Sequence, residues 1–247
     1  MQTHRSLIRN TVRQFTADPR DGRLPALLLA LTVVTGLVDA VSILELGRVF
    51  VANMTGNIVF IGFAVASAPG FSLTASLIAL AGFLAGAGAG GPLTRRLGSS
   101  RTRLLAITAG TELVLVGTAT IVVAAVAIPL PSGARDAVAG LLALAMGVQN
   151  TTARSLAVPD LTTTVLTMTL TGIASDVRAG ATPTIFRRLL SVAAMLAGAA
   201  IGALLVIHSE TALTLAIAVG LLLMVGAMAL QARTVAPEAA AAKTPAH

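Results

Sequence analysis

Long runs without a charged side chain dominate this sequence and limit what it can fold into. Residues 49–94 and 137–153 carry no charge, and residues 104–130 carry only Glu112. A helical membrane crossing needs about 20 predominantly apolar residues. Charged residues make up 11% of the chain, against about 25% in soluble domains, so a water-soluble globule is excluded. The sequence predicts an all-α polytopic membrane protein.

Turn residues and charges divide the apolar runs into eight expected segments. Pro69 and Gly70 split the longest run, because neither residue favours a helix interior. The expected segments are 24–45, 50–68, 72–92, 104–128, 136–154, 161–175, 187–207 and 211–231. The sixth segment would be about 22 Å long as a helix, which is too short to cross a hydrocarbon core of about 30 Å.

The placement of Lys and Arg indicates how many of these segments cross. If all eight crossed, the four arginines within residues 95–103 would lie outside the cell. If the second and sixth segments instead enter and leave on the same side, only Arg48 and Arg135 of the 17 Lys and Arg residues lie outside. Because basic loops favour the cytoplasm, we expect six crossings, two re-entrant or broken segments, and both termini in the cytoplasm.

The two halves of the chain resemble each other at an offset of 111 to 112 residues. Asp39 then corresponds to Asn150, and Thr55 to Thr167. Small residues four apart, which let helices approach closely, match in the same way: Gly36 with Gly147, and Gly82, Gly86 and Gly90 with Ala194, Gly198 and Gly202. Each half, about 24–128 and 136–231, would have three crossings. We therefore expect two inverted-topology repeats, as in many secondary transporters.

The two segments that are not expected to cross carry the candidate substrate path. In the first, polar side chains alternate with apolar ones, and glycine permits an unwound turn; the candidates are Asn53, Thr55, Gly56 and Asn57. The second is rich in threonine, with the candidates Thr163, Thr164, Thr167 and Thr169. An interrupted helix persists in a membrane only inside protein or beside a water-filled cavity. The alternative is that these side chains are polar contacts between ordinary helices.

Three further side chains are candidate functional groups inside the membrane, where acids are costly and commonly functional. Asp39 is expected towards the outer face and Asn150 towards the inner face, so that they flank the path. Glu112 lies about 12 Å into its segment and is the candidate proton acceptor, with Met224 as its counterpart. The alternatives are structural: Asp39 would hold the neighbouring broken segment, and Glu112 would bond to helix backbone or pair with an arginine.

Missing residue types and motifs exclude several classes of protein. The chain has no Cys, so disulfides and thiolate chemistry are impossible, and it has no Trp or Tyr, so base stacking on nucleic acid is not expected. It contains no G-x-S-x-G or P-loop motif. The three histidines, His4, His208 and His247, lie near expected membrane edges or in the tails. We expect no enzyme, no metal site, no cofactor and no nucleic-acid partner.

One part of the sequence resembles a known family. Residues 36–42, Gly-Leu-Val-Asp-Ala-Val-Ser, and residues 47–57, Gly-Arg-Val-Phe-Val-Ala-Asn-Met-Thr-Gly-Asn, resemble the first-half signature of the YoaK-like membrane proteins, the domain-of-unknown-function 1275 family. Residues 147–150 and the threonine-rich segment resemble its second half, except that Thr-Met-Thr at 167–169 replaces an expected Thr-Gly-Thr. The resemblance covers about residues 24–231. It implies a bacterial inner-membrane protein and no particular activity.

The predicted organisation is a basic cytoplasmic leader at residues 1–23, one transmembrane domain at 24–231 and a disordered cytoplasmic tail at 232–247. The expected function is a small secondary transporter or channel-like permease for a small solute, with the proton as the candidate coupling ion. The alternative is a non-transporting membrane module that binds a partner protein or lipid. Expected partners are membrane lipid and a small molecule or proton, and the sequence leaves a homo-oligomer open.

Overall fold

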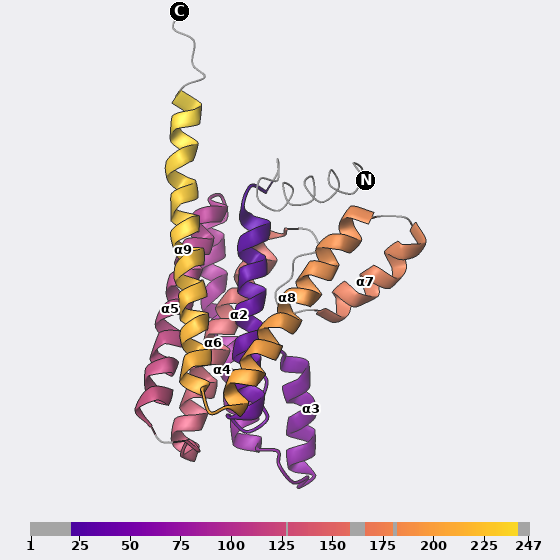
Figure 1. Cartoon of the computed structure of the whole chain (residues 1–247), viewed down its shortest axis with the longest axis vertical. Helices are drawn as coiled ribbons and strands as arrows, with labels where there is room; N and C mark the ends of the chain where they lie inside the picture. Colours follow the sequence, from indigo (N-terminus) through magenta and orange to yellow (C-terminus); the bar gives the residue numbers. More distant parts are fainter. Residues whose placement is uncertain (1–20, 127, 159–165, 180–181, 242–247) are drawn as a thin grey trace, which may run out of the picture.

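A computed structural model of the chain describes residues 21–126, 128–158, 166–179 and 182–241. Within these ranges the chain folds into eight α-helices, which confirms the predicted all-α class (Figure 1). In chain order they are α2 (Leu24–Leu44), α3 (Met54–Val65), α4 (Leu73–Leu97), α5 (Arg101–Ala125), α6 (Ser132–Leu156), α7 (Leu166–Ala179), α8 (Thr182–Ile207) and α9 (Thr211–Ala241).

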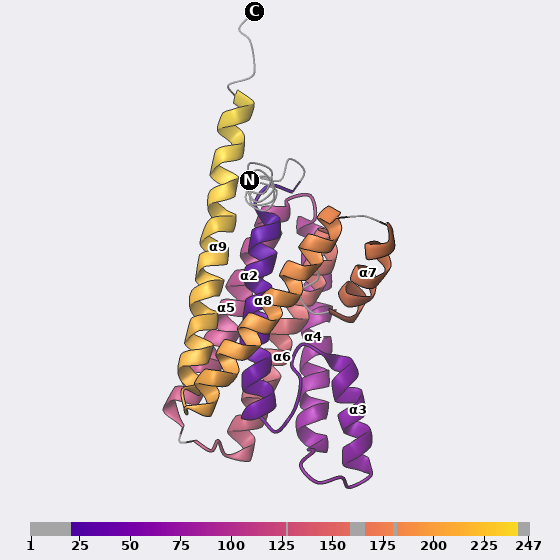
Figure 2. The same ribbon diagram turned by 45° about the vertical axis from the view of Figure 1, so that its right-hand side comes forward.

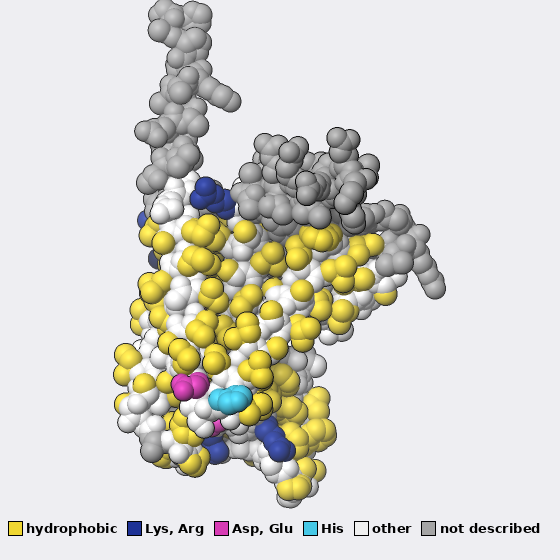
Figure 3. Space-filling model, in the orientation of Figure 1, with side chains coloured by type: hydrophobic (Ala, Val, Ile, Leu, Met, Phe, Trp, Pro, Cys, Tyr) yellow, Lys and Arg dark blue, Asp and Glu magenta, His cyan; other side chains and the backbone are white. Residues whose placement is uncertain are grey.

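Five helices are long and apolar enough to cross a membrane. They are α2, α4, α5, residues 185–207 of α8 and residues 211–232 of α9. Helix α6 has 25 residues, as many as α4 and α5, but the polar run Gln149-Asn-Thr-Thr152 lowers its hydropathy. Hydrophobic side chains cover the side of the molecule shown in Figure 3, and charged side chains gather near the two ends. The chain is therefore a multi-pass membrane protein.

Helices α4 and α6 lie side by side and run in the same direction, in close contact through small residues. A Cβ added to Gly86 would meet the carbonyl oxygen of Leu144, and one added to Gly147 would meet the carbonyl oxygen of Phe83. Because each glycine lies against the backbone of the other helix, neither position has room for a side chain.

Helices α2 and α8 form a second pair of the same kind. A Cβ added to Gly198 would meet the carbonyl oxygen of Val33, and one added to Gly36 would lie 2.5 Å from the carbonyl oxygen of Met195. The small residues that the sequence analysis assigned to close helix packing therefore lie at two interfaces, and at each one a glycine of either helix contacts backbone of the other.

The contacts at these two interfaces correspond residue by residue. Four residues at the α2–α8 interface have counterparts that make the equivalent contact at the α4–α6 interface, at an offset of 111 or 112 residues: Val33 with Leu144, Gly36 with Gly147, Met195 with Phe83, and Gly198 with Gly86. The remaining long helices, α5 and α9, pack against each other. Helix α5 also packs on α6, as α9 does on α2.

The two short helices lie at opposite ends of the bundle. Helix α3 packs on α4 and has 12 residues, or about 18 Å of length; α7 packs on α8 and has 14 residues, or about 21 Å. Figure 2 shows both helices on the same flank of the bundle, α3 near the end where α2 stops and α7 near the end where α2 begins. Both are shorter than the hydrocarbon core of about 30 Å.

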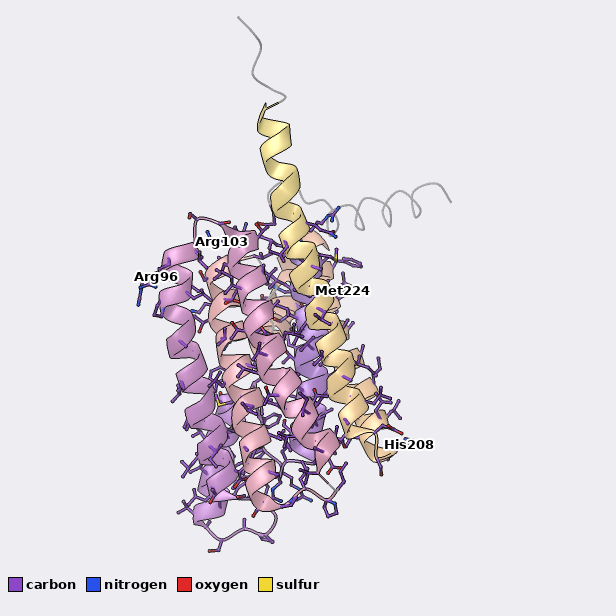
Figure 4. The ribbon with its side chains drawn as sticks, turned by 90° about the vertical axis from the view of Figure 1, so that its left-hand side faces the viewer. Arg96, Arg103, His208 and Met224 are labelled. Atoms are coloured by element: carbon purple, nitrogen blue, oxygen red, sulfur yellow. The ribbon has the colours of Figure 1, made fainter. Side chains whose placement is uncertain are left out.

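The end of the bundle where α2 begins also holds the turn between α4 and α5. Figure 4 shows Arg96 and Arg103 at this end and His208 at the other, with Met224 between them on α9. Arg101 joins three elements here, because its guanidinium bonds the Asp21 carboxylate at 2.6 Å and the carbonyl oxygen of Leu156 at 2.5 Å.

The two ends of the chain compare with expectation as follows. Of the expected leader at residues 1–23, residues 1–20 lie outside the described part of the chain. The disordered tail was expected from residue 232, whereas helix α9 includes residues 232–241 and only residues 242–247 are not described.

Candidate functional site

The first candidate segment begins with a non-helical stretch of chain that lies next to the carboxylate of Asp39. Asp39 lies in α2 and is buried, with 8% of its surface exposed. Backbone N–H groups of Val51 and Ala52 hydrogen-bond to its carboxylate, while Oδ1 has no partner among the described residues. This contact agrees with the structural alternative for Asp39, in which the carboxylate holds the neighbouring broken segment. Within the described part of the chain, it leaves one carboxylate oxygen without a hydrogen-bond partner.

Asn57 closes the same non-helical stretch from the other side. Its side chain is completely buried. Its Oδ1 accepts a hydrogen bond from the backbone N–H of Phe50 at 2.9 Å, and its Nδ2 donates one to the Phe50 carbonyl oxygen at 2.6 Å. The Asn57 amide therefore provides hydrogen-bond partners for the backbone N–H and C=O of Phe50, which lies outside any helix. Backbone groups in apolar surroundings require such partners.

Gly56 has a different structural role from the one expected. The expectation of an unwound turn at this residue is wrong, because Gly56 lies inside helix α3 and the non-helical chain precedes it. A Cβ at Gly56 would lie 2.5 Å from the ring of Phe50. That ring stacks on Phe60 with a centroid distance of 5.5 Å. Glycine is therefore needed here for close approach of an aromatic ring, and that requirement could not be read from the local sequence.

Of the four candidate residues in the first segment, Asn53 and Thr55 are exposed. Asn53 is the N-cap residue of α3, but its side chain makes no capping hydrogen bond. Both side chains therefore lie on the outer surface of the described structure at the start of a short helix.

The second candidate segment is described only in part. Thr163 and Thr164 lie outside the described residues. Thr167 is exposed near the start of α7, and Thr169 is buried. Asn150, which precedes this segment on α6, is half-buried. The two candidate segments are therefore brought to one flank of the bundle, on different levels along it (Figures 1 and 2).

Glu112 lies apart from both segments, on the buried face of α5 that also carries Thr108. We call these two side chains, with the buried Thr152 and Gln149 of α6 and Thr35 of α2, the polar cluster of α2, α5 and α6. Neither of its carboxyl oxygens has a hydrogen-bond partner in the described part of the chain, and its side chain is completely buried. The expected alternatives, a bond to helix backbone or a pair with an arginine, are thus not found among the described residues. One helical turn away on α5, Thr108 bonds Thr152 of α6 at 2.7 Å.

Sequence reasoning missed Gln149 in this cluster. Its side chain is completely buried, and its Nε2 donates to Thr35 Oγ1 of α2 at 2.8 Å. Its carbonyl oxygen Oε1 has no partner among the described residues. The available signal was a large amide beside Asn150 in a charge-free run, since such a group must find a partner in the apolar interior.

Comparisons with known proteins give the family of the chain. The family described as "Protein of unknown function (DUF1275)" matches residues 27–228. The "UPF0700 transmembrane protein YoaK" of Bacillus subtilis (strain 168) is 32% identical over 151 residues, which is 61% of this chain. The match spans 66% of that relative's own length, just under two thirds.

No solved structure matches the chain. The family match covers nearly all of the helical bundle, including the two short helices and the polar cluster of α2, α5 and α6. The chain belongs to the DUF1275 family of transmembrane proteins.

Proposed function

We propose that this protein is a small secondary transporter or channel-like permease for a small solute. The observation that carries the proposal is the non-helical chain at residues 45–53, which Asp39 and Asn57 hold inside an otherwise helical membrane bundle. Unwound backbone at membrane depth is tolerated only inside protein or along a water-filled cavity. Transporters place their substrate sites at such interrupted helices.

The proposal includes six crossings and two inverted repeats. Helix α6 would be the sixth crossing, because it is as long as α4 and lies along it. The matching glycine contacts of the α2–α8 and α4–α6 interfaces support a duplication. In an inverted pair, α3 and α7 would dip into the bilayer from opposite faces.

The proposed location is the bacterial inner membrane, with both termini in the cytoplasm. Support comes from the arginines at the turn between α4 and α5, which lies at the same end of the bundle as the start of α2 (Figure 4). Lys and Arg in short loops favour the cytoplasmic side. This end would therefore face the cytoplasm, and the end with His208 would face outward.

Within the proposed path, some candidate residues have exposed side chains, and others are buried and contact the backbone of the broken segment. Asn53, Thr55 and Thr167 are exposed at the starts of the two short helices and would contact the solute. Asn57 would act as a positioning residue, because both ends of its amide bond the Phe50 backbone. Asp39 would do both, since it lies against the broken segment and has one carboxylate oxygen that bonds none of the described residues.

A ligand screen followed by uptake tests this function. Purified protein is heated with amino acids, sugars, organic acids and inorganic ions, because a ligand that binds the folded state raises its apparent stability. Uptake of the stabilising solute is then measured in reconstituted vesicles. We expect Thr55→Val to remove both stabilisation and uptake.

The matched control for this experiment is Thr118→Val, a second exposed threonine, on α5 away from both short helices. It should leave both readouts unchanged. Equal effects of the two variants, or stabilisation without uptake, would contradict the transport proposal. Stabilisation without uptake would favour the module that binds lipid or a partner without transporting.

A further inference from the structure

A buried polar cluster between α2, α5 and α6 has two acceptor groups without a donor. Gln149 bonds Thr35 at 2.8 Å, and Thr108 bonds Thr152 at 2.7 Å. The carboxyl oxygens of Glu112 and the amide oxygen of Gln149 have no partner among the described residues. All of these side chains are buried, with at most 1% of their surface exposed.

The register of α5 and α6 brings these two groups to the same level of the bundle. The two helices pack against each other and run in opposite directions. The Thr108–Thr152 hydrogen bond fixes their alignment. Glu112 follows Thr108 by one turn on α5, and Gln149 precedes Thr152 by about one turn on α6. Because the helices are antiparallel, both steps lead towards the same end, on faces that are already in contact.

With the side chains placed as they are, a proton on the carboxyl group satisfies both acceptors at once. An ionised carboxylate and an amide oxygen both only accept hydrogen bonds, whereas a protonated carboxyl group donates one. Two other helices contact α5. Residues 211–232 of α9 contain no Asp, Glu, Lys, Arg or His, and the charged side chains of α4, Arg95 and Arg96, lie in its last turn, at the end of the bundle. An isolated buried charge is also far more costly than a neutral, bonded group.

We propose that Glu112 carries a proton and donates a hydrogen bond to Gln149 Oε1. The bond completes a chain that runs in one direction across three helices. Glu112 donates to Gln149, Gln149 Nε2 donates to Thr35 Oγ1, and Thr35 donates to the carbonyl oxygen of Leu31 at 3.0 Å. Gln149 is thus a positioning residue for an internal proton site.

This site connects the two halves of the chain, since α2 and α5 come from the first half and α6 from the second. Loss of the proton would leave two acceptors facing each other and remove the Glu112–Gln149 bond, while the Thr108–Thr152 bond between α5 and α6 would remain. A role in coupling solute movement to protons rests on the proposed transport function. The protonated carboxyl and its bond to Gln149 do not, and they are tested without any solute.

Infrared spectroscopy of the full chain in lipid vesicles at neutral pH tests the site directly. The C=O stretching band of a protonated carboxyl group lies apart from the bands of carboxylates. We expect this band in the wild-type protein, its loss in Glu112→Gln and its retention in Asp39→Asn. In Gln149→Met the band should move to higher frequency, because the carboxyl group loses its acceptor, whereas Thr108→Val should leave it in place.

Two results would overturn the inference. One is that no protonated-carboxyl band depends on Glu112. The other is that Gln149→Met and Thr108→Val shift the band equally. If Glu112→Gln does not fold, ¹³C labelling of glutamate identifies the band in the wild-type protein, and Glu210→Gln, at the exposed end of the bundle, serves as its control. Because no solute is present, a negative result leaves the uptake experiment unaffected.

Discussion

At the scale of single residues, some polar groups inside the bundle have hydrogen-bond partners that are near in sequence, and others have partners that are far away in sequence. The role of Asn57 depends on Phe50, seven residues away, so a polar residue in a broken segment was a reasonable candidate without the structure. Gln149 depends on Thr35, 114 residues away. Sequence alone cannot identify such a partner, because helix packing brings the two groups together. That is why sequence reasoning selected Asn150 and missed its neighbour.

The structure predicts that Asn57 matters for stability because of what it satisfies. Asn57→Leu would leave the N–H and C=O of the half-buried Phe50 without their present partner, and an unsatisfied group costs up to about 1–3 kcal/mol. We expect a clear fall in the unfolding temperature in detergent. Asn53→Leu, at an exposed position, should change stability by less than about 0.5 kcal/mol. Equal stability of the two variants would rule out the assigned role of Asn57.

At the scale of elements, hydropathy located every described helix but not its ends. Helix α8 begins at Thr182 rather than at residue 187, because the helix continues on the far side of Arg187 and Arg188 to a start at Thr182 and Pro183, and proline is compatible with the first helical turn. Arginine is a good helix former, so charge marks where the membrane ends and not where the helix ends. Helix α3 is shorter than expected, with bounds 54–65 instead of 50–68. The chain before it can stay non-helical because side chains of other residues hydrogen-bond its backbone N–H and C=O groups.

Pairing of the elements could be predicted only in part. The glycine ladders indicated close helix contacts, and the structure contains them. The ladders did not identify the partners, since a small residue is equally compatible with any neighbouring helix. The pairing of α2 with α8 and of α4 with α6 joins helices of different halves, which the sequence gives no local reason to expect.

Because the α2–α8 and α4–α6 interfaces make equivalent contacts, equivalent substitutions in them should have similar effects on stability. Gly86→Ala and Gly198→Ala each place a methyl group against a carbonyl oxygen of the neighbouring helix, and such overpacking costs about 1–3 kcal/mol. We expect both variants to lower the unfolding temperature by similar amounts. Gly117→Ala, where no atom lies within 4 Å of the added Cβ, should leave stability unchanged or raise it by up to about 1 kcal/mol. A destabilising Gly117→Ala, or a neutral Gly86→Ala, would contradict this account of the interfaces.

At the scale of the whole molecule, the membrane topology depends on where the chain turns back. The turn between α3 and α4 lies at the end of the bundle where α2 stops, and the turn between α4 and α5 lies at the opposite end (Figures 1 and 4). If the membrane surrounds this bundle, α3 enters and leaves on one side. The charge pattern led to the same expectation, because it is a property of the whole chain and needs no knowledge of helix pairing.

Cysteine labelling of the intact chain tests this topology most directly, because the protein has no native cysteine. Glu45→Cys, Ala66→Cys and Ser99→Cys place single thiols before α3, after α3 and after α4. A membrane-impermeant maleimide is applied to right-side-out and inside-out vesicles. A re-entrant α3 predicts that positions 45 and 66 react from outside and position 99 only from the cytoplasmic side. Reaction of positions 45 and 66 from opposite sides would show that α3 crosses the membrane and would contradict the account.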